Sequence, residues 1–445
     1  MHGPSATNQR FSCKKLLLCL IRGVLLSLVI PLGAAEAPAG DLDTHAKKIR
    51  EFGTYLSRMT PDGRQQYARQ LARIPALRAR VNARETAGQG TLCSHQILSE
   101  VSWLAGSVMN PARLEKRLDD LESVLAHPEE EAKAAQQDSS DGGWGSCHDE
   151  WFFKVNATFD HLSKPSNAAE TPRYPLHLFD RVNSPEKLQE YFANVAVSDL
   201  ALTGIDHRRE LNESLSDLTR LIVRGIPAYY AWHPRLKEAL VERIIPSLRN
   251  ARTGWWAESY VRNGQAEFVD DLSVTFHVIS YLRGDVPNLP AVMDHLLAVK
   301  DLDYPIGWLE EGRRSNHNQM DVVTLFRFVW PYANDAQKKA ATAEIHRMLD
   351  WCLRESLQPD GSFKPDAGSN ESIEESTSWG VSFLARIGFF DPAKRFWTDA
   401  SFPHAEPIRQ KLIGYIEKHK AAGGAGGVYY EHDLEELKIG EPDRR

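Results

Sequence analysis

The middle of the chain alternates between two kinds of apolar pattern. Segments such as 270–282, 320–330 and 374–390 are apolar on nearly every side of a helix, whereas segments such as 340–356 carry charged residues along one side. A helix that is apolar all round must be buried on both sides, and an amphipathic helix faces solvent. The pattern predicts an all-α protein in which inner, buried helices alternate with outer, amphipathic ones.

These helix pairs follow a regular period. Pairs of glycine and an aromatic residue place Trp255, Trp308 and Phe363 at intervals of 53 and 55 residues. Acidic residues are expected to open the apolar helices with a similar spacing, at positions Asp217, Asp271, Asp321 and Glu375. A period of about fifty residues suits a helical hairpin with its loop, and about six such hairpins fit the chain.

The stretch LQPDGSF, residues 357–363, combines a proline and a glycine that together signal a turn. With the apolar helix that follows, it resembles the repeat of the terpenoid-cyclase and protein-prenyltransferase toroid superfamily, in which a Gln-x-x-Gly-aromatic turn packs neighbouring hairpins together. The resemblance implies an α/α toroid across residues 91–415, with Gln358 bracing backbone groups and Phe363 lying under the next helix. It implies architecture and not chemistry.

The two ends of the chain differ from this repeating core. Residues 1–37 combine basic residues, an apolar run and small residues, which predicts an export signal and a periplasmic or secreted protein. Residues 38–90 are basic and helical in pattern, which predicts an N-terminal helical extension. Residues 128–143 are polar, acidic and free of apolar anchors, which predicts a surface loop. Residues 416–445 predict a glycine-rich connector and a charged tail.

Composition and cysteine content limit the kinds of partner and metal that the protein is expected to bind. The chain of 445 residues carries a net charge of -7 and has a pI near 6.2, which argues against a general affinity for nucleic acid. No membrane partner is expected unless the export signal stays uncleaved as an anchor. In an exported protein Cys93 and Cys147 are expected to pair, and Cys352 to be a small buried side chain. Cys147-His148 is an alternative zinc-binding element, but no cofactor or metal is expected.

Chemistry is expected where loops enter the inner helices, because in a toroid those loops gather at one mouth of the central cavity. Four such loops are rich in charged and amide side chains, at 146–156, 257–271, 309–321 and 364–376. The third loop has four adjacent candidates directly before an apolar helix: Arg313, Arg314, Asn316 and His317.

The third loop also has a resemblance of its own. Its Ser315-Asn316-His317 is similar to the Asn-His element at the start of an inner helix in toroidal polysaccharide lyases that act on alginate or heparin-like chains. The similarity implies β-elimination of a uronic acid, in which Asn316 and Arg314 hold the carboxylate, His317 takes a proton and Tyr260 donates one. The alternative is that the asparagines cap the helix and that His317 is a surface side chain.

Other cations and histidines of the chain are assigned more simply. Arg208 and Arg209 would extend a cationic mouth towards an acidic polymer, although paired surface arginines are usually solvated. A structural role is the default for the histidines that lie within helical patterns, namely His95, His233, His277 and His346.

A second hypothesis uses paired carboxylates, because glycoside hydrolysis needs two carboxyl groups at a defined separation. Glu258 and Glu310 are the candidates for that pair, and Trp255 and Trp308 are candidates for stacking on sugar rings. The alternative for acidic residues at helix starts is capping, and for the repeated tryptophans it is packing.

The sequence therefore predicts an exported, carbohydrate-active toroid enzyme with lyase-like or hydrolase-like action on an acidic polysaccharide. The alternative from another class is a non-catalytic toroid that binds a glycan or a protein in its cavity. Terpenoid or prenyl chemistry is a minor alternative, because Phe268 stands where the Asp-x-Asp-Asp acid of terpene cyclisation has its first aspartate.

Overall fold

The computed structural model describes residues 42–87, 89–164, 167, 172–365, 372–421 and 427–439. The chain divides into two compact units, residues 1–39 and 40–445, and the description below concerns the second. The predicted export signal lies outside the described residues, as do residues 422–426 of the predicted connector. Within the described ranges no helix combines the length and the apolar character needed to cross a membrane.

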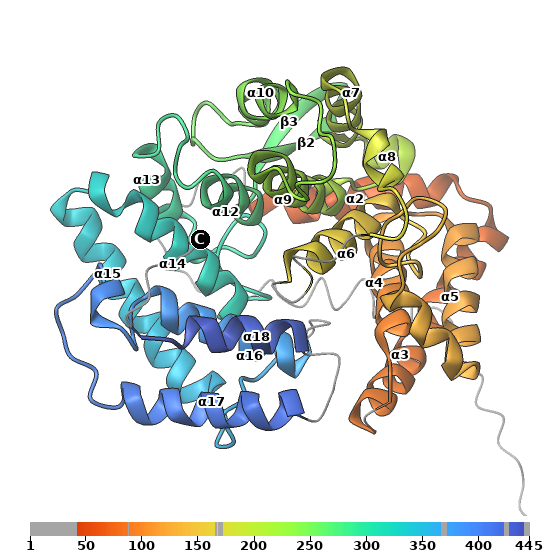
Figure 1. Ribbon diagram of the computed structural model, residues 1–445. Helices are drawn as coiled ribbons and strands as arrows, with labels where there is room; N and C mark the ends of the chain where they lie inside the picture. Colours follow the sequence, from red (N-terminus) through yellow and green to blue (C-terminus); the bar gives the residue numbers. More distant parts are fainter. Residues whose placement is uncertain are drawn as a thin grey trace, which may run out of the picture. The chain divides into compact units, whose positions relative to one another are not determined.

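Helices make up most of the described chain, which confirms the prediction of an all-α fold. One series, called here the inner series, consists of α6 (Trp151–Ser163), α9 (Arg208–Arg224), α12 (Leu272–Tyr281), α14 (Asn316–Val329), α16 (Ile373–Arg386) and α18 (Gly427–Glu436). Each member contacts the next in this order (Figure 1). Helices that are far apart in the sequence are thereby brought side by side.

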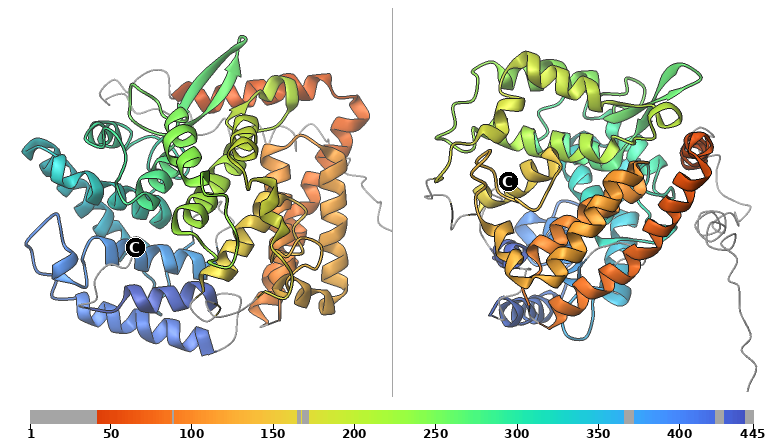
Figure 2. Two further views of the ribbon diagram at one scale, coloured as in Figure 1. Left: turned by 45° about the horizontal axis from the view of Figure 1, so that its top comes forward. Right: turned by 90° about the vertical axis from the view of Figure 1, so that its right-hand side faces the viewer.

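A second, outer series packs against the first. It consists of α7 (Pro185–Val195), the continuous segment of α10 (Leu236–Glu238), η4 (Ala239–Ile244) and α11 (Ile245–Ser247), then α13 (Ala291–Ala298), α15 (Asp335–Trp351) with η6 (Cys352–Ser356), and α17 (Ala405–Ala421). The burial follows the predicted pattern, because α14 is buried on nearly every side whereas α15 buries one side only. Figure 2 shows the two series from two further directions.

The N-terminal helices belong to the same compact unit as the two series. Thr60 separates α2 (Leu42–Arg58) from α3 (Pro61–Thr86) and accepts a hydrogen bond from the backbone N–H of Gly63 at 3.1 Å. α3 contacts α4 (Leu92–Ser107) and α5 (Pro111–Ala126), while α2 contacts the short α8 (Leu200–Thr203). The remaining short helical turns are η1 (Pro128–Ala135), η3 (His177–Arg181), η5 (Trp330–Tyr332) and η7 (Pro392–Lys394).

A small sheet precedes α12, in a segment that the sequence analysis assigned to a loop. β2 (Ala257–Arg262) and β3 (Gln265–Asp270) form an antiparallel hairpin, and β1 (Val197–Ser198) pairs with β2 in parallel. The loop prediction for 257–271 is therefore wrong, and its Asn263-Gly264 turn was the missed hairpin signal. Because side chains alternate along a strand, Glu258 and Tyr260 lie on one face of β2.

The turn at LQPDGSF joins neighbouring helix pairs. Gly361 has a φ of 101°, as the turn signal predicted, and the side chain of Gln358 donates to the backbone oxygen of Ser356 at 2.7 Å. Phe363 is fully buried beneath Gly380 of α16, where an added Cβ would lie 2.5 Å from the phenyl ring. The predicted packing of Phe363 under the next helix is confirmed.

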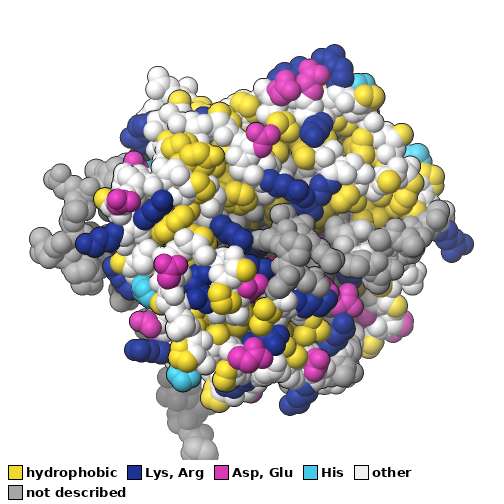
Figure 3. Space-filling model, turned by 60° about the vertical axis from the view of Figure 1, so that its left-hand side comes forward, with side chains coloured by type: hydrophobic (Ala, Val, Ile, Leu, Met, Phe, Trp, Pro, Cys, Tyr) yellow, Lys and Arg dark blue, Asp and Glu magenta, His cyan; other side chains and the backbone are white. Residues whose placement is uncertain are grey.

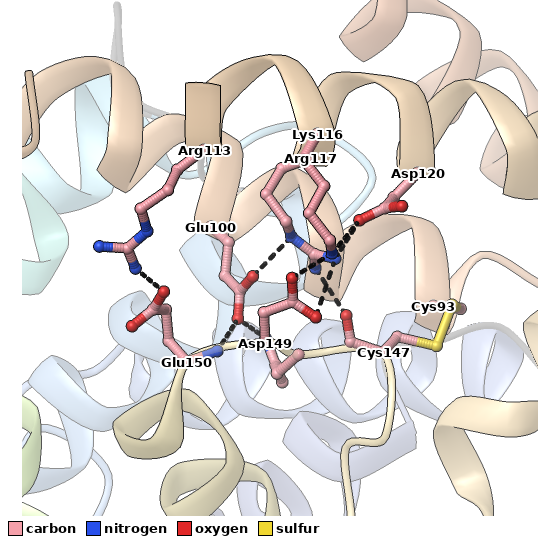
Figure 4. A network of polar contacts seen from close by, with 10 residues as sticks. Cys93, Glu100, Arg113, Lys116, Arg117, Asp120, Cys147, Asp149 and Glu150 are labelled. Atoms are coloured by element: carbon pink, nitrogen blue, oxygen red, sulfur yellow. Dashed lines mark hydrogen bonds and ion pairs between the residues drawn. A yellow bond between two sulfur atoms is a disulfide. The ribbon is translucent and has the colours of Figure 1, made fainter. Parts of the chain in front are cut away.

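The predicted disulfide between Cys93 and Cys147 is present and lies beside a polar network (Figure 4). Glu100 is fully buried on α4 and forms an ion pair with Arg117, with 2.7 Å between Oε2 and Nε. It also accepts a hydrogen bond from the backbone N–H of Glu150 at 2.9 Å. Arg117 also donates to the backbone oxygen of Cys147 at 2.6 Å. These contacts fasten α4 and α5 to the start of α6, so loop 146–156 has a structural role.

The structure of two further segments differs from what the sequence predicts. The stretch 128–143 is not free of anchors, because Glu131 is buried and accepts hydrogen bonds from the backbone N–H groups of Cys93 at 2.8 Å and Ser94 at 3.1 Å. An anion at a helix N-terminus satisfies unpaired N–H groups and favours the helix dipole. The predicted charged tail forms α18, whose buried Asp433 accepts from Ser378 at 2.7 Å.

The acidic residues of the repeat do not all open helices. Asp271 is the N-cap of α12 and accepts from the backbone N–H of Val274 at 3.0 Å. Ser315 caps α14, so Asp321 lies in the second turn of that helix, and Asp217 lies in the middle of α9. The expectation of an acidic opening residue is correct for Asp271 and wrong for Asp321 and Asp217.

Candidate functional site

Arg208, the first residue of α9, is a cation held in a fixed position. Its backbone N–H donates to Asp206 Oδ1 at 3.0 Å, and its Nε donates to Asp271 Oδ2 at 2.5 Å. Its guanidinium lies over the ring of Tyr304, 4.8 Å from the centroid. Among the described residues, Arg208 Nη2 has no hydrogen-bond acceptor. The Nη2 atom itself is buried, whereas 18% of the surface of the Arg208 side chain is accessible.

Tyr304 reaches this position because its loop folds back on α12. Its backbone N–H donates to the oxygen of Leu309 at 2.7 Å, and the N–H of Leu272 donates to the oxygen of Pro305 at 2.7 Å. Burial raises the pKa of Tyr304, the charge of Asp271 adds to this, and Arg208 opposes it. Tyr304 is therefore a protonated phenol near neutral pH.

His317 projects from the first turn of α14. Its ring lies 4.7 Å from the ring of Trp379 on α16 and 6.2 Å from the ring of Tyr304. Burial and the positive charge of Arg208 lower the pKa of His317 to about 4, although its side chain keeps 32% of its surface accessible. The His317 side chain is therefore partly accessible although protein surrounds it. His317 is neutral there at neutral pH.

His277 lies on the neighbouring inner helix, α12. Its Nδ1 is 3.0 Å from Asn212 Oδ1, and Asn212 Nδ2 donates to Ser273 Oγ at 3.0 Å. Its ring stacks on that of Tyr281 with 5.3 Å between centroids. Burial lowers the pKa of His277 well below its usual value, and the charges of Arg220, His317 and Arg208 add to this. His277 is also neutral near neutral pH.

These groups come together from several elements, and we call them the Arg208 site: Arg208, His277, Tyr304, His317 and Trp379. The sequence predicts His317 as a catalytic base and Arg208 as part of a cationic mouth, and it predicts a structural role for His277. For Tyr304 and Trp379 the sequence gives no functional prediction. No sequence pattern shows that the loop carrying Tyr304 folds back on α12.

A second polar network adjoins the first through Arg208. The hydroxyl of Tyr260 lies 3.0 Å from Asp206 Oδ1 and 2.9 Å from Glu258 Oε1, and Tyr260 has no exposed surface. Lys48 of α2 places its Nζ 3.3 Å from Asp206 Oδ2 and 3.9 Å from Glu258 Oε1. The predicted proton donor Tyr260 is thus engaged with two carboxyl groups.

The two carboxyl groups of this network differ in protonation. Burial raises the pKa of Glu258 to about 7, the charge of Asp271 adds to this, and Lys48 and Arg208 oppose it. Although burial also acts on Asp206, the charge of Lys48 and the hydrogen bonds from Arg208 and Tyr260 hold its pKa below the usual range. At neutral pH Asp206 is ionised and Glu258 is partly protonated.

The remaining predicted residues of the third loop face other partners. Glu310 and Arg313 pair through their backbones in a tight turn, with N–O distances of 2.7 and 2.9 Å. Arg314 places its Nη2 3.7 Å from Glu344 of the outer helix α15. The structure therefore does not show these residues in contact with the Arg208 site.

Asn316 and the two predicted tryptophans are buried. Asn316 donates from Nδ2 to Ser356 Oγ at 2.6 Å, at the end of the outer segment η6. Trp255 and Trp308 lie in the core, where Trp308 packs edge-on against Phe326 at 5.6 Å. In this conformation the tryptophans pack the helices together and present no face to a sugar.

A further carboxyl group lies on α9 below the site. Asp217 accepts a hydrogen bond from Asn156 Nδ2 at 3.1 Å and is paired with Arg220, whose guanidinium lies over Phe159. Burial raises the pKa of Asp217 to about 7, against the opposing charge of Arg220. Asp217 is therefore a second buried carboxyl that titrates near neutrality.

In the described part of the chain, neither a metal-ligand cluster nor the pocket beside α2 involves residues of the Arg208 site. Across the described ranges, no group of three or more His, Cys, Asp or Glu side chains is placed to hold a metal ion. A pocket of about 260 Å³ lies beside α2, α5 and α8 and is lined in part by Tyr55, Met59 and Met109. Its lining includes none of the residues of the Arg208 site.

Charges on the molecular surface are mixed. On the face shown in Figure 3, lysine and arginine side chains lie among acidic and hydrophobic ones. Comparison of the chain with protein families, with characterised proteins and with solved structures finds no match. The geometry of the Arg208 site is therefore the feature of the molecule that bears most directly on function.

Proposed function

We propose that this protein is a carbohydrate-active enzyme that cleaves a uronate-containing polysaccharide by β-elimination at the Arg208 site. The observation that carries the proposal is the arrangement of Arg208. Its side chain is partly accessible, its buried Nη2 has no acceptor among the described residues, and its charge acts on the imidazoles of His317 and His277. A cation for the carboxylate, a base and a protonated phenol are the groups that this elimination requires.

The reaction balances with these groups alone. Arg208 binds the uronate carboxylate and makes the proton on the adjacent carbon more acidic. An imidazole takes that proton, a carbon–carbon double bond forms, and the bond to the leaving sugar oxygen breaks. Tyr304 gives its proton to that oxygen, and the imidazolium then returns a proton to the phenolate. The site is restored without a co-reactant.

The assignment of the phenol differs from the sequence prediction. Tyr260 is fully buried with its hydroxyl between Asp206 and Glu258, whereas Tyr304 lies under Arg208 and faces His317. A proton donor must come within hydrogen-bonding distance of the leaving oxygen. We therefore give this role to Tyr304 and regard Tyr260 as a support for the loop that carries Arg208.

We further propose that the inner and outer series close into an α/α toroid. The order of contacts from α6 to α18 and the alternation with outer helices support this. Outside this order, the carboxylates of Glu85 on α3 and Glu375 on α16 both raise the pKa of His95 on α4 against the effect of burial. Glu375 belongs to α16, so α16 and α4 come within electrostatic reach.

Hydrolysis is the second candidate, favoured by the carboxyl pair of Asp206 and Glu258. Environments that push two carboxyl pKa values apart are typical of the acid and the nucleophile of glycosidases. The pair is covered by Lys48 and Tyr260, and Glu258 retains only 1% of its surface. A sugar reaches it only if α2 moves, so elimination remains the preferred proposal.

The test is a screen of purified protein against uronate polymers and neutral polysaccharides. We expect ultraviolet absorbance from unsaturated uronate only with the uronate polymers. Arg208→Ala should lower kcat/KM by about 10- to 100-fold, because a charged hydrogen bond is lost. The matched control is Arg354→Ala, which removes a largely exposed arginine of η6.

Each other outcome contradicts elimination in its own way. New reducing ends without ultraviolet absorbance indicate hydrolysis, and Glu258→Gln should then remove the activity. Binding of a polymer without any cleavage indicates the non-catalytic alternative. Cleavage that survives Arg208→Ala unchanged places the chemistry elsewhere in the molecule.

A further inference from the structure

His277 is the imidazole whose orientation is best defined in the Arg208 site. It belongs to α12, and Asn212 of α9 lies 3.0 Å from its Nδ1. Asn212 is itself held, because its Nδ2 donates to Ser273 Oγ at 3.0 Å. His317 has no such partner among the described residues, since its contact with Asp321 is 3.9 Å between Nε2 and Oδ2.

The partners of Asn212 define the tautomer of His277. With Nδ2 donating to Ser273, the Oδ1 of Asn212 is the atom that faces His277 and accepts its hydrogen. Nδ1 then carries the hydrogen, and the lone pair is on Nε2. The opposite orientation of the Asn212 amide would reverse this assignment, so the tautomer is an observable that tests the argument.

We infer that His277, oriented by Asn212, is the general base of the Arg208 site. This inference rests on the proposed function and adds to it the residue that accepts the proton. Nε2 of His277 has no hydrogen-bond partner among the described residues, and His277 as a whole residue is partly exposed. His317, beside Trp379, then forms an aromatic wall for the sugar ring.

The surroundings of His277 favour a neutral base. Arg208 and Arg220 on α9 carry charges that disfavour an imidazolium at His277, and His317 on α14 does so only when it is itself protonated. On its own helix the phenol of Tyr281 stacks on the ring. When Nε2 takes the substrate proton, the C–H bond breaks, and the bound carboxylate on Arg208 partly offsets the new positive charge.

The first test is nitrogen NMR of protein labelled with ¹⁵N-histidine, which distinguishes the two tautomers without any substrate. We expect the signals of His277, identified by their loss in His277→Gln, to show hydrogen on Nδ1 near neutral pH. Asn212→Ala should remove this preference. Hydrogen on Nε2 in the wild-type protein, or an unchanged pattern in Asn212→Ala, overturns the orientation argument.

The second test is the rate of cleavage of a uronate polymer. His277→Gln should lower kcat/KM by about 100-fold or more, because general-base catalysis contributes that much. His317→Gln should lower it by less than about tenfold, and the outer-helix control His346→Gln should leave it unchanged. A larger effect of His317→Gln than of His277→Gln overturns the inference while the proposed function stands.

Asn212→Asp adds a readout that a structural role would not produce. A carboxylate beside Nδ1 raises the pKa of the imidazole, so the acid limb of the kcat/KM profile should move up by about one pH unit or more. An unchanged acid limb contradicts the inference. If no uronate polymer is cleaved by the wild-type protein, the proposed function and the base role both fail, whereas the NMR result still decides the orientation of His277.

Discussion

The surroundings of single side chains in this protein shift their pKa values and so determine their protonation states. Burial raises the pKa of Glu258 to about 7, the charges of Asp271 and Asp206 add to this, and Lys48 and Arg208 oppose it. His317 is shifted in the opposite direction, to about 4, by burial and by Arg208. Both shifts favour the neutral form, because a low-dielectric environment disfavours a charge on either group.

The raised pKa of Glu258 predicts a pH dependence of stability. A carboxyl whose pKa rises from 4.5 to about 7 on folding binds its proton more tightly in the folded state. The free energy of unfolding therefore decreases as the pH rises between these two values. The decrease is at most roughly 3 kcal/mol. Glu258→Gln stays neutral and should not show this loss.

Chemical denaturation of the wild-type protein and of Glu258→Gln at about pH 5 and about pH 8 measures the difference. Other raised carboxyls such as Asp217 affect both proteins alike, so they cancel. The account expects the stability of the wild-type protein, relative to the variant, to be higher at the lower pH. Equal differences at both pH values would show that Glu258 is ionised throughout.

The elements could be predicted from the sequence where one pattern dominates. Helices such as α14 are apolar on nearly every side, and this alone identifies them as buried. The start of α14 is predicted wrongly. The spacing of acidic residues predicts that Asp321 opens the helix, whereas Ser315 is its N-cap. The β2–β3 hairpin was missed, because its segment is rich in polar residues and was assigned to a loop.

The contact between Phe363 and Gly380 predicts a stability change that is specific to one helix pair. A methyl group at Gly380 would lie 2.5 Å from the ring of Phe363, so Gly380→Ala should destabilise the protein by about 1–3 kcal/mol. Gly414→Ala in α17 is the control, because no atom lies within 4 Å of its added Cβ. Helix propensity alone should make that change neutral or favourable by up to about 1 kcal/mol.

Chemical denaturation of the two glycine variants provides the comparison. A Gly380→Ala protein as stable as Gly414→Ala would mean that α16 and the 357–363 turn are not packed as described. The turn would then have no role in joining the helix pairs.

At the scale of the whole molecule, the site depends on contacts that no local pattern contains. Arg208 meets Asp271 across 63 residues, and His277 meets Asn212 across 65. The period of the helices predicts that loops from different repeats converge, and Arg208 is one of the cations that the sequence offers for their common mouth. Which side chains converge depends on the paths of the loops, and the path of the Tyr304 loop is set by backbone hydrogen bonds to α12.

We expect the disulfide to stabilise the folded protein. Cys93 and Cys147 are separated by 54 positions, so reducing their bond should lower the free energy of unfolding by about 2–4 kcal/mol. Urea titrations with and without reductant, compared with the Cys93→Ser and Cys147→Ser double variant, measure this. Cys352 is buried elsewhere and should not replace either partner. A reductant without effect on the wild-type midpoint would contradict the expected stabilisation.

The most direct test of the account is a crystal structure with a bound uronate oligosaccharide. We predict that a uronate carboxylate binds the guanidinium of Arg208, with the adjacent C–H facing the imidazole of His277 and the glycosidic oxygen facing the hydroxyl of Tyr304. An oligosaccharide bound only on the outer helices, with no ligand near Arg208, would contradict the account.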